Sequence, residues 1–183
     1  MLEQQRVLRS HPPDVRDALL RRTFELALRA RDAGEAPFGA LLADAEGHIL
    51  LEHANSVEAN RDPTDHAEAG LVRRACGQLP AEVIAQSHMY ASSEPCGMCS
   101  CAIFWVGIPR LTYGCPGSYI SELAAQPGFR DQEHPLAGGA PNISADDVLV
   151  GSNALGFQRI VEGGMLFDEA KAVHRGYWVQ EDL

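Results

Sequence analysis

Three potential metal ligands lie at the beginnings of two predicted helices. His66 offers an imidazole nitrogen, and Cys96 and Cys99 of a Pro-Cys-Gly-Met-Cys segment offer two thiolates. One imidazole and two thiolates are a ligand set for tetrahedral Zn²⁺, and three protein ligands leave the fourth position for water. A helix N-terminus lowers the pKa of a cysteine thiol and so favours the thiolate that the metal requires. The residue types and their spacing therefore predict a catalytic zinc site.

Glu68 follows the first of these ligands by two residues and could move a proton at the metal. A carboxylate is a poor ligand for a site of soft thiolates, but it can take a proton from water and return it to another atom. The order His-x-Glu followed by Pro-Cys-x-x-Cys is the signature of zinc deaminases of nucleobases. In that chemistry hydroxide attacks the amidine carbon of a base. The glutamate protonates the ring nitrogen and then the departing amine, and ammonia leaves.

Cys101 offers an alternative to the catalytic site. If it were a fourth protein ligand, the zinc site would have no position for water and would be structural. It follows Cys99 by two residues, about 200° around a helix, so we expect its side chain to face away from the metal. The chain has five cysteines, an odd number, and three of them are clustered. That is a poor disulfide framework and favours a metal site in a reducing compartment, which we take to be the cytoplasm.

The helices that carry the ligands have clear start signals. The Asp-Pro-Thr-Asp segment at 62–65 supplies a cap, a first-turn proline and an acidic residue, so a helix is expected over 66–77. A short buried strand is expected at 88–93, and Pro95 breaks it. The second ligand helix is expected from about 97 to 106.

The other predicted elements form a sheet for these helices to pack on. An amphipathic helix is expected over 13–33, and an antiparallel hairpin over 38–56. Further strands are expected at 111–114 and 157–163, and a last helix at 165–178. Helices that alternate with short strands after a hairpin predict an α/β domain with a mixed sheet.

Length and composition fit one globular domain over residues 1–183. Hydrophobic residues make up 45% of the chain and charged residues 22%, which excludes a disordered, collagen-like or coiled-coil protein. No apolar run approaches the ~20 residues of a membrane span, and the first twenty residues hold no apolar secretion segment. Fifteen Lys and Arg against 25 Asp and Glu give a net charge of −10, which disfavours nucleic acid as a partner.

The chain resembles the cytidine and deoxycytidylate deaminase superfamily, and within it the small purine-type members. The resemblance covers about residues 14–116 and rests on Pro37-Phe38-Gly39-Ala40, Asn55, Asp62-Pro63-Thr64, His66-Ala67-Glu68, Glu94-Pro95-Cys96-Gly97-Met98-Cys99 and the stretch 102–110. It implies a three-layer α/β/α fold with a five-stranded mixed sheet, one zinc ion per chain and a homodimer. The residues at 14–116 would be the catalytic core, and 117–183 a C-terminal lid or tail segment.

The same resemblance implies a set of substrate contacts. Asn55 is expected to contact the base or a ribose hydroxyl, Phe38 to stack on the base, and Ala67 to lie beside it. Asp131 can stand in for an acidic residue of the Gly-Phe-Asp-Asp segment of guanine deaminases, although Gly-Phe-Arg-Asp departs from that segment. Trp178 is expected to close the pocket, either of its own subunit or of a neighbouring subunit, by stacking on the ring.

Structural alternatives remain for these contacts. Phe38 could be an ordinary core residue, and Asn55 an ordinary strand-end residue. Tyr177 and Trp178 could simply attach the last helix to the core. In the lid interpretation, Glu181 or Asp182 could also accept an N–H of the base.

The sequence thus predicts zinc-dependent hydrolytic deamination of a free nucleobase or nucleoside, with guanine or a related aminopurine as the best substrate. A cytosine or cytidine substrate stays open, because the same amidine chemistry serves both rings. A tRNA-specific adenosine deaminase shares the motifs but needs a basic groove, which the net charge and the single lysine, Lys171, disfavour. A non-catalytic zinc scaffold is disfavoured because it has no need of Glu68.

Overall fold

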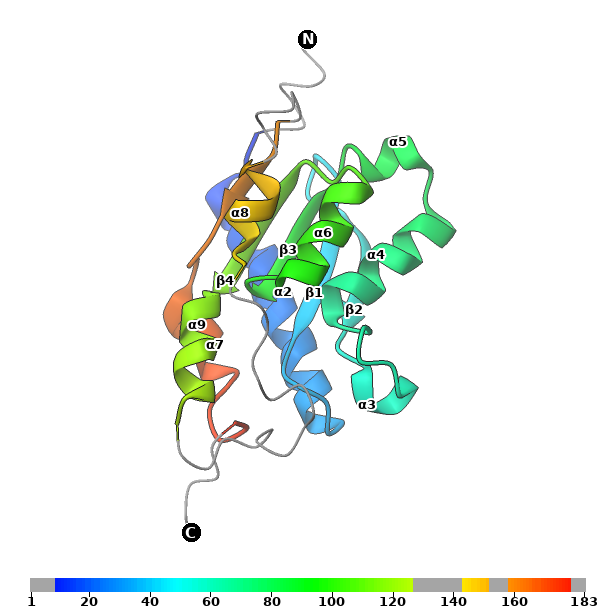
Figure 1. Cartoon of the computed structure of the whole chain (residues 1–183). Coiled ribbons are helices and arrows are strands. Elements are labelled where there is room, and N and C mark those ends of the chain that lie inside the picture. The colour runs from blue at the N-terminus through cyan, green and yellow to red at the C-terminus, as the bar shows by residue number, and fades with distance from the viewer. Residues whose placement is uncertain (1–8, 127–142, 152–157, 179–183) are drawn as a thin grey trace.

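A five-stranded mixed sheet forms the centre of the computed structural model, in the order β2-β1-β3-β4-β5 (Figure 1). The strands are β1 (Gly39–Ala43), β2 (Ile49–Ala54), β3 (His88–Ser93), β4 (Arg110–Cys115) and β5 (Ile160–Glu162). β1 pairs antiparallel with both β2 and β3, whereas β4 runs parallel to β3 and β5 runs parallel to β4. The predicted mixed sheet of five strands is confirmed.

The structure describes residues 9–126, 143–151 and 158–178. Three sequence predictions lie outside these ranges: the substrate contact at Asp131, and the acidic lid residues Glu181 and Asp182. Among the described helices, none has both the length and the apolar character needed to cross a bilayer.

Helices cover both faces of the sheet and give three layers (Figure 1). One face carries α4 (Ala67–Gln78), α6 (Gly97–Trp105) and α8 (Ala145–Leu149), and the other carries α2 (Pro13–Asp32) and α9 (Phe167–Ala172). Because strand side chains alternate, Leu42 of β1 enters the first core and Leu41 enters the second. The predicted α/β/α architecture is confirmed.

The last helix is shorter than its prediction of 165–178, which was wrong at both ends. α9 begins after Leu166, whose φ of 52° is left-handed, and it ends at Ala172. Gly176 has a φ of 67°, which a right-handed helix does not tolerate, so the chain continues as turns to Trp178. Three short helices were not predicted: α3 (Val57–Asn60), α5 (Ala81–Ile84) and α7 (Gly117–Ala124).

The strand register brings distant segments to one edge of the sheet. Gly39 at the start of β1 lies opposite Ala54 at the end of β2, so Phe38 and Asn55 are neighbours. The Asn55 backbone N–H donates to the Phe38 carbonyl oxygen at 3.0 Å. β3 runs antiparallel to β1 and therefore ends at the same edge, where the chain continues to Cys96. The edge thus collects the predicted ligand and substrate segments.

Candidate active site

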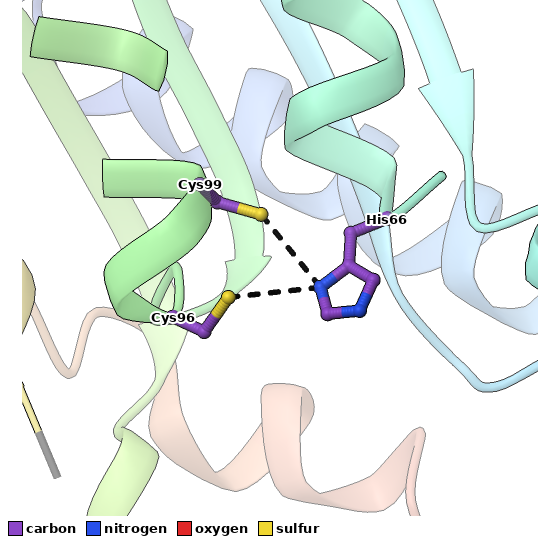
Figure 2. Close-up of side chains that lie close together, drawn as sticks. All are labelled: His66, Cys96 and Cys99. Atoms are coloured by element: carbon purple, nitrogen blue, oxygen red, sulfur yellow. Dashed lines mark hydrogen bonds between the residues drawn. The ribbon is translucent and has the colours of Figure 1, made fainter. Parts of the chain in front are cut away.

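His66, Cys96 and Cys99 come together where α4 and α6 begin (Figure 2). His66 is the residue before α4, Cys96 is the residue before α6, and Cys99 lies in the first turn of α6. Both sulfur atoms lie 3.7 Å from His66 Nδ1, and the three ligand atoms lie within 4.8 Å of one another. Tetrahedral zinc with bonds of ~2.3 Å to sulfur and ~2.0 Å to nitrogen would separate S and N by ~3.6 Å. The side chains therefore fit a zinc ion.

Cys101 does not join this group. Its side chain is exposed, whereas Cys99 on the same helix is buried. Among the described residues, the potential metal-binding group consists of one histidine and two cysteines. This arrangement agrees with a site of three protein ligands rather than a closed site of four.

The two thiols have opposite pKa shifts because they share a hydrogen bond. The hydrogen bond with Cys99 lowers the pKa of Cys96 to about 4, and the same contact raises the pKa of Cys99. The hydrogen bond with Cys96 also raises the pKa of His66. Since metal binding requires two thiolates and a neutral imidazole, a cation that binds here must displace the protons that these groups hold.

Glu68 lies in the first turn of α4, two residues after His66, and only 5% of it is exposed. Burial raises the pKa of its carboxyl to about 7. A carboxyl group with this pKa can both accept and release a proton near neutral pH, which general acid–base catalysis requires. Ala67, between the two, is fully buried in the core, so its predicted substrate contact would have to use its backbone.

Asn55 and Phe38 lie at the same edge of the sheet. Asn55 is buried, and its Nδ2 donates to Glu35 Oε2 at 3.1 Å. Phe38 is half-buried, and its ring centre lies 5.6 Å from that of His174 and 5.9 Å from that of Trp178. Sequence reasoning missed Glu35, although it stands two residues before the Pro-Phe-Gly-Ala segment.

A buried histidine connects Trp178 to the strand that leads to the cysteines. The indole Nε1–H of Trp178 donates to His174 Nδ1 at 3.0 Å. The ring proton is therefore on Nε2, which lies 3.1 Å from Ser93 Oγ at the end of β3. Burial lowers the pKa of His174 to about 4, so the ring is neutral near pH 7. Sequence reasoning also missed His174, because no motif surrounds it.

Glu94, two residues before Cys96, connects the cysteine loop to two later helices. Its Oε2 accepts a hydrogen bond from the Gly117 backbone N–H at 2.9 Å, at the start of α7. Its Oε1 accepts one from the Ala145 N–H at 3.0 Å, at the start of α8. The carboxylate thus positions both helices relative to the ligand loop.

Asp65 connects the loop that ends at His66 to the segments around it. It accepts hydrogen bonds from Ser56 Oγ at 2.5 Å and from Asn60 Nδ2 at 2.6 Å. It also forms an ion pair with Arg73 of α4. These contacts join the loop after β2 to the start of α4 and so fix the backbone beside the histidine ligand.

The model of the cytidine and deoxycytidylate deaminase zinc-binding region matches residues 14–115. The chain belongs to this deaminase family. The family binds zinc, and in this deaminase His66, Cys96 and Cys99 form the group that could hold the ion. The deaminase is accordingly a hydrolytic enzyme.

Named relatives of this deaminase differ in substrate. A probable cytosine deaminase of Schizosaccharomyces pombe is 32% identical over 164 residues, which cover 88% of this chain and 91% of the relative. A tRNA-specific adenosine deaminase of Agrobacterium fabrum is 36% identical over 124 residues, covering 66% of this chain and 80% of the relative. A solved guanine deaminase from Bacillus subtilis has a TM-score of 0.51 and 33% identity, covering 58% of this chain and 68% of that chain. The predicted cytidine-deaminase-like fold is confirmed.

Removal of either thiolate ligand should release the metal. Cys96→Ala or Cys99→Ala deletes one of three protein bonds to zinc, so we expect far less than one zinc per chain after gel filtration, measured by mass spectrometry of the metal. Cys101→Ala on the same helix is the matched control and should keep about one zinc per chain. An empty site in the Cys101 variant would contradict the three-ligand site.

Stability should depend on pH through His174. Its folded pKa is about 4, whereas an unfolded histidine titrates near ~6.5. The unfolded chain binds more protons between these values, so stability is full above ~pH 6.5 and falls as the pH drops toward 4. Glutamine does not titrate, so the His174→Gln variant does not lose this part of its stability in acid. The difference in unfolding free energy between wild type and the variant should therefore become smaller from ~pH 7 to ~pH 5.

Urea unfolding at several pH values measures this difference. Acid release of zinc affects both proteins and cancels in the comparison. A deficit that stays constant with pH would show that His174 is not held neutral in the folded state.

Proposed function

We propose that this deaminase acts on a free nucleobase or nucleoside, and that guanine or a related aminopurine is its substrate. The observation that carries the catalytic part is a buried carboxyl, Glu68, in the same helical turn that follows the histidine ligand. A structural zinc site has no need of a buried carboxyl at this position. The purine preference rests on the Pro-Phe-Gly-Ala and Asp-Pro-Thr-x-His-Ala-Glu segments and on the likeness to a guanine deaminase.

The residues around the site would divide the work of hydrolytic deamination. Zinc, when bound, supplies a Lewis acid that lowers the pKa of water. Glu68 would take a proton from the attacking water and give it to the ring nitrogen. It would then carry the proton of the added hydroxyl to the amine, so that the C–N bond breaks, a carbonyl forms and ammonia leaves. A carboxyl pKa of about 7 suits both directions of transfer. Asn55 orients the base by hydrogen bonding.

An aromatic wall would hold the flat ring of the substrate. Phe38 and Trp178 lie in contact within one chain, so we propose that the C-terminal segment completes the pocket of its own subunit. Residues 14–116 are then the catalytic core, and 117–183 are the segment that includes the tail. The contact predicted at Asp131 stays a prediction.

A tRNA substrate is disfavoured by the distribution of charge. The chain has a net charge of −10 and a single lysine. Four arginines outside the core are already paired with carboxylates: Arg16 with Asp17, Arg21 with Glu169, Arg22 with Glu25 and Glu52, and Arg73 with Asp62 and Asp65. Paired cations offer little counterion release to an RNA backbone. A small substrate therefore fits better.

We also propose that two copies of the chain associate through the outer face of α6. Met98, Cys101 and Trp105 are spaced by three and four residues and are exposed, Trp105 by 82%. A large exposed indole on an apolar stripe is typical of an interface. The five free cysteines suit a reducing compartment, and we propose the cytoplasm.

Zinc-loaded enzyme should release ammonia from a free base. We expect the highest kcat/KM for guanine in a panel with guanosine, cytosine, cytidine, adenine and a tRNA anticodon stem-loop. Glu68→Gln should keep its fold and zinc but lose activity on the order of 10²–10⁴-fold, because an amide cannot accept the proton of water.

The ammonia assay on wild type and Glu68→Gln tests the role of the carboxyl and the purine preference separately. Near-normal turnover by zinc-loaded Glu68→Gln would contradict the role of the carboxyl. Cytosine or the stem-loop as the best substrate would contradict the purine preference and leave the deaminase chemistry intact.

Oligomeric state tests the proposed interface. Wild type should be a dimer by light scattering, and Trp105→Glu should shift the mass toward the monomer, because it replaces the largest apolar side chain of the stripe with a charge. Leu28→Glu changes an exposed leucine of α2 and is the matched control, expected to stay dimeric. A monomeric wild type, or a dimeric Trp105→Glu, would argue against this interface.

A further inference from the structure

Glu35 is a buried carboxylate at the substrate edge that the catalytic scheme does not use. Only 4% of the residue is exposed. α2 ends just before it, Gly34 has a φ of 89°, and the Glu35 backbone N–H donates to the Ala30 carbonyl at 3.0 Å. This turn directs the chain back toward the sheet and carries the Glu35 side chain inward. A buried carboxylate needs hydrogen-bond donors to offset the loss of water.

Three N–H groups satisfy this carboxylate. Oε1 accepts from the Ala59 backbone N–H at 2.7 Å, and Oε2 accepts from the Glu58 N–H at 3.0 Å. The third donor is the side-chain amide of Asn55, whose Nδ2 lies 3.1 Å from Oε2. Two of the donors belong to the short helix α3, and the third belongs to the residue proposed to orient the substrate.

The contact with a carboxylate determines which end of the Asn55 amide faces the protein. An ionised carboxylate only accepts hydrogen bonds, so Asn55 must present its NH₂ group to Glu35 and not its carbonyl oxygen. The backbone of Asn55 is fixed as well, because its N–H donates to the Phe38 carbonyl at 3.0 Å. Within the described residues, Asn55 Oδ1 receives no hydrogen bond from the protein.

We propose that Glu35 is a positioning residue that orients the Asn55 amide and so makes Oδ1 an acceptor for a substrate N–H or O–H. This inference rests on the proposed role of Asn55 in substrate binding. It adds a chemical class: the substrate must present a hydrogen-bond donor to Asn55, such as a ring N–H of an oxopurine or a ribose hydroxyl. A base that presents only a lone pair there would leave Oδ1 unsatisfied, which disfavours its binding.

Glu35→Gln separates orientation from packing. Glutamine has nearly the same shape. With its NH₂ group at the Oε2 position, its carbonyl oxygen still accepts the Ala59 N–H, and the Glu58 N–H loses its acceptor. Its own amide can also donate to Asn55, which would allow the Asn55 amide to turn by ~180°. A packing role would be largely preserved in this variant, whereas an orienting role would be lost.

A double-mutant cycle in kcat/KM tests the coupling. Zinc-loaded wild type, Glu35→Gln, Asn55→Ala and the double variant are compared on the best substrate of the panel. We expect Glu35→Gln to lower kcat/KM on the order of tenfold, mainly through a higher KM, and to have no further effect once Asn55 is alanine. Asp62→Asn is the matched control, because Asp62 accepts the Thr64 N–H at 2.8 Å in the same loop without contacting Asn55. Its effect should add to that of Asn55→Ala.

A second measurement does not depend on activity. The side-chain amide signals of Asn55 in a ¹⁵N spectrum, assigned by their loss in Asn55→Ala, should shift in Glu35→Gln and stay in place in Asp62→Asn. Unchanged signals in Glu35→Gln would overturn the proposal, and so would additive effects in the cycle. If wild type released ammonia from none of the bases, the proposed function would fail, while the amide signals would still decide whether Glu35 orients Asn55.

Discussion

Two helix beginnings must meet at one edge of the sheet, and the rest of the structure serves this constraint. His66 and Cys96 each stand immediately before a helix, so the packing of α4 against α6 determines the distance between imidazole and thiol. Leu71 of α4 and Ile103 of α6 are fully buried in the same core, above the same face of the sheet. Because close-packed interiors transmit small displacements, a substitution in this core would change the distance between the imidazole and the thiols.

Carboxylates hold the loops around this meeting point. Glu94 accepts N–H groups from the first residues of α7 and α8, and Glu35 accepts two from α3. The first N–H groups of a helix have no partner within the helix, so a carboxylate from another segment satisfies them and joins the two segments. The same edge that carries Glu68, the carboxyl proposed to transfer protons, thus uses Glu35 and Glu94 as hydrogen-bond acceptors. All three are carboxyl groups, so it is the burial and the hydrogen-bond donors around each one that decide whether it holds a loop or could transfer a proton.

Local signals predicted the ligands but not their supports. The proline and glycine around Cys96 and the Asp-Pro-Thr-Asp segment before His66 indicate where each helix begins, and the start of each was predicted within a residue. The predicted cap at Asp62 was wrong, because His66 is the N-cap residue of α4 and, among the described residues, no side chain caps this helix. The supports depend on contacts between distant segments, such as Ser93 with His174, 81 residues apart, and Glu94 with Ala145, 51 residues apart. No periodicity or spacing within one segment encodes such a pair. The early end of α9 was missed for a related reason, since a glycine at 176 is compatible with several backbone conformations until packing selects one.

Substrate choice must come from the groups that face the part of the base farther from the metal. In the proposed chemistry, the metal site and Glu68 act on an amidine carbon that aminopurines and cytosine share, so they cannot discriminate between the rings. On the proposed function, discrimination falls to Asn55 and to the aromatic wall of Phe38 and Trp178. That wall depends on a neutral His174, because a protonated ring would have no lone pair to accept the Trp178 Nε1–H. Burial of His174 lowers its pKa and so maintains its contact with Trp178, and burial of Glu68 separately raises the pKa of the carboxyl that the proposed chemistry uses.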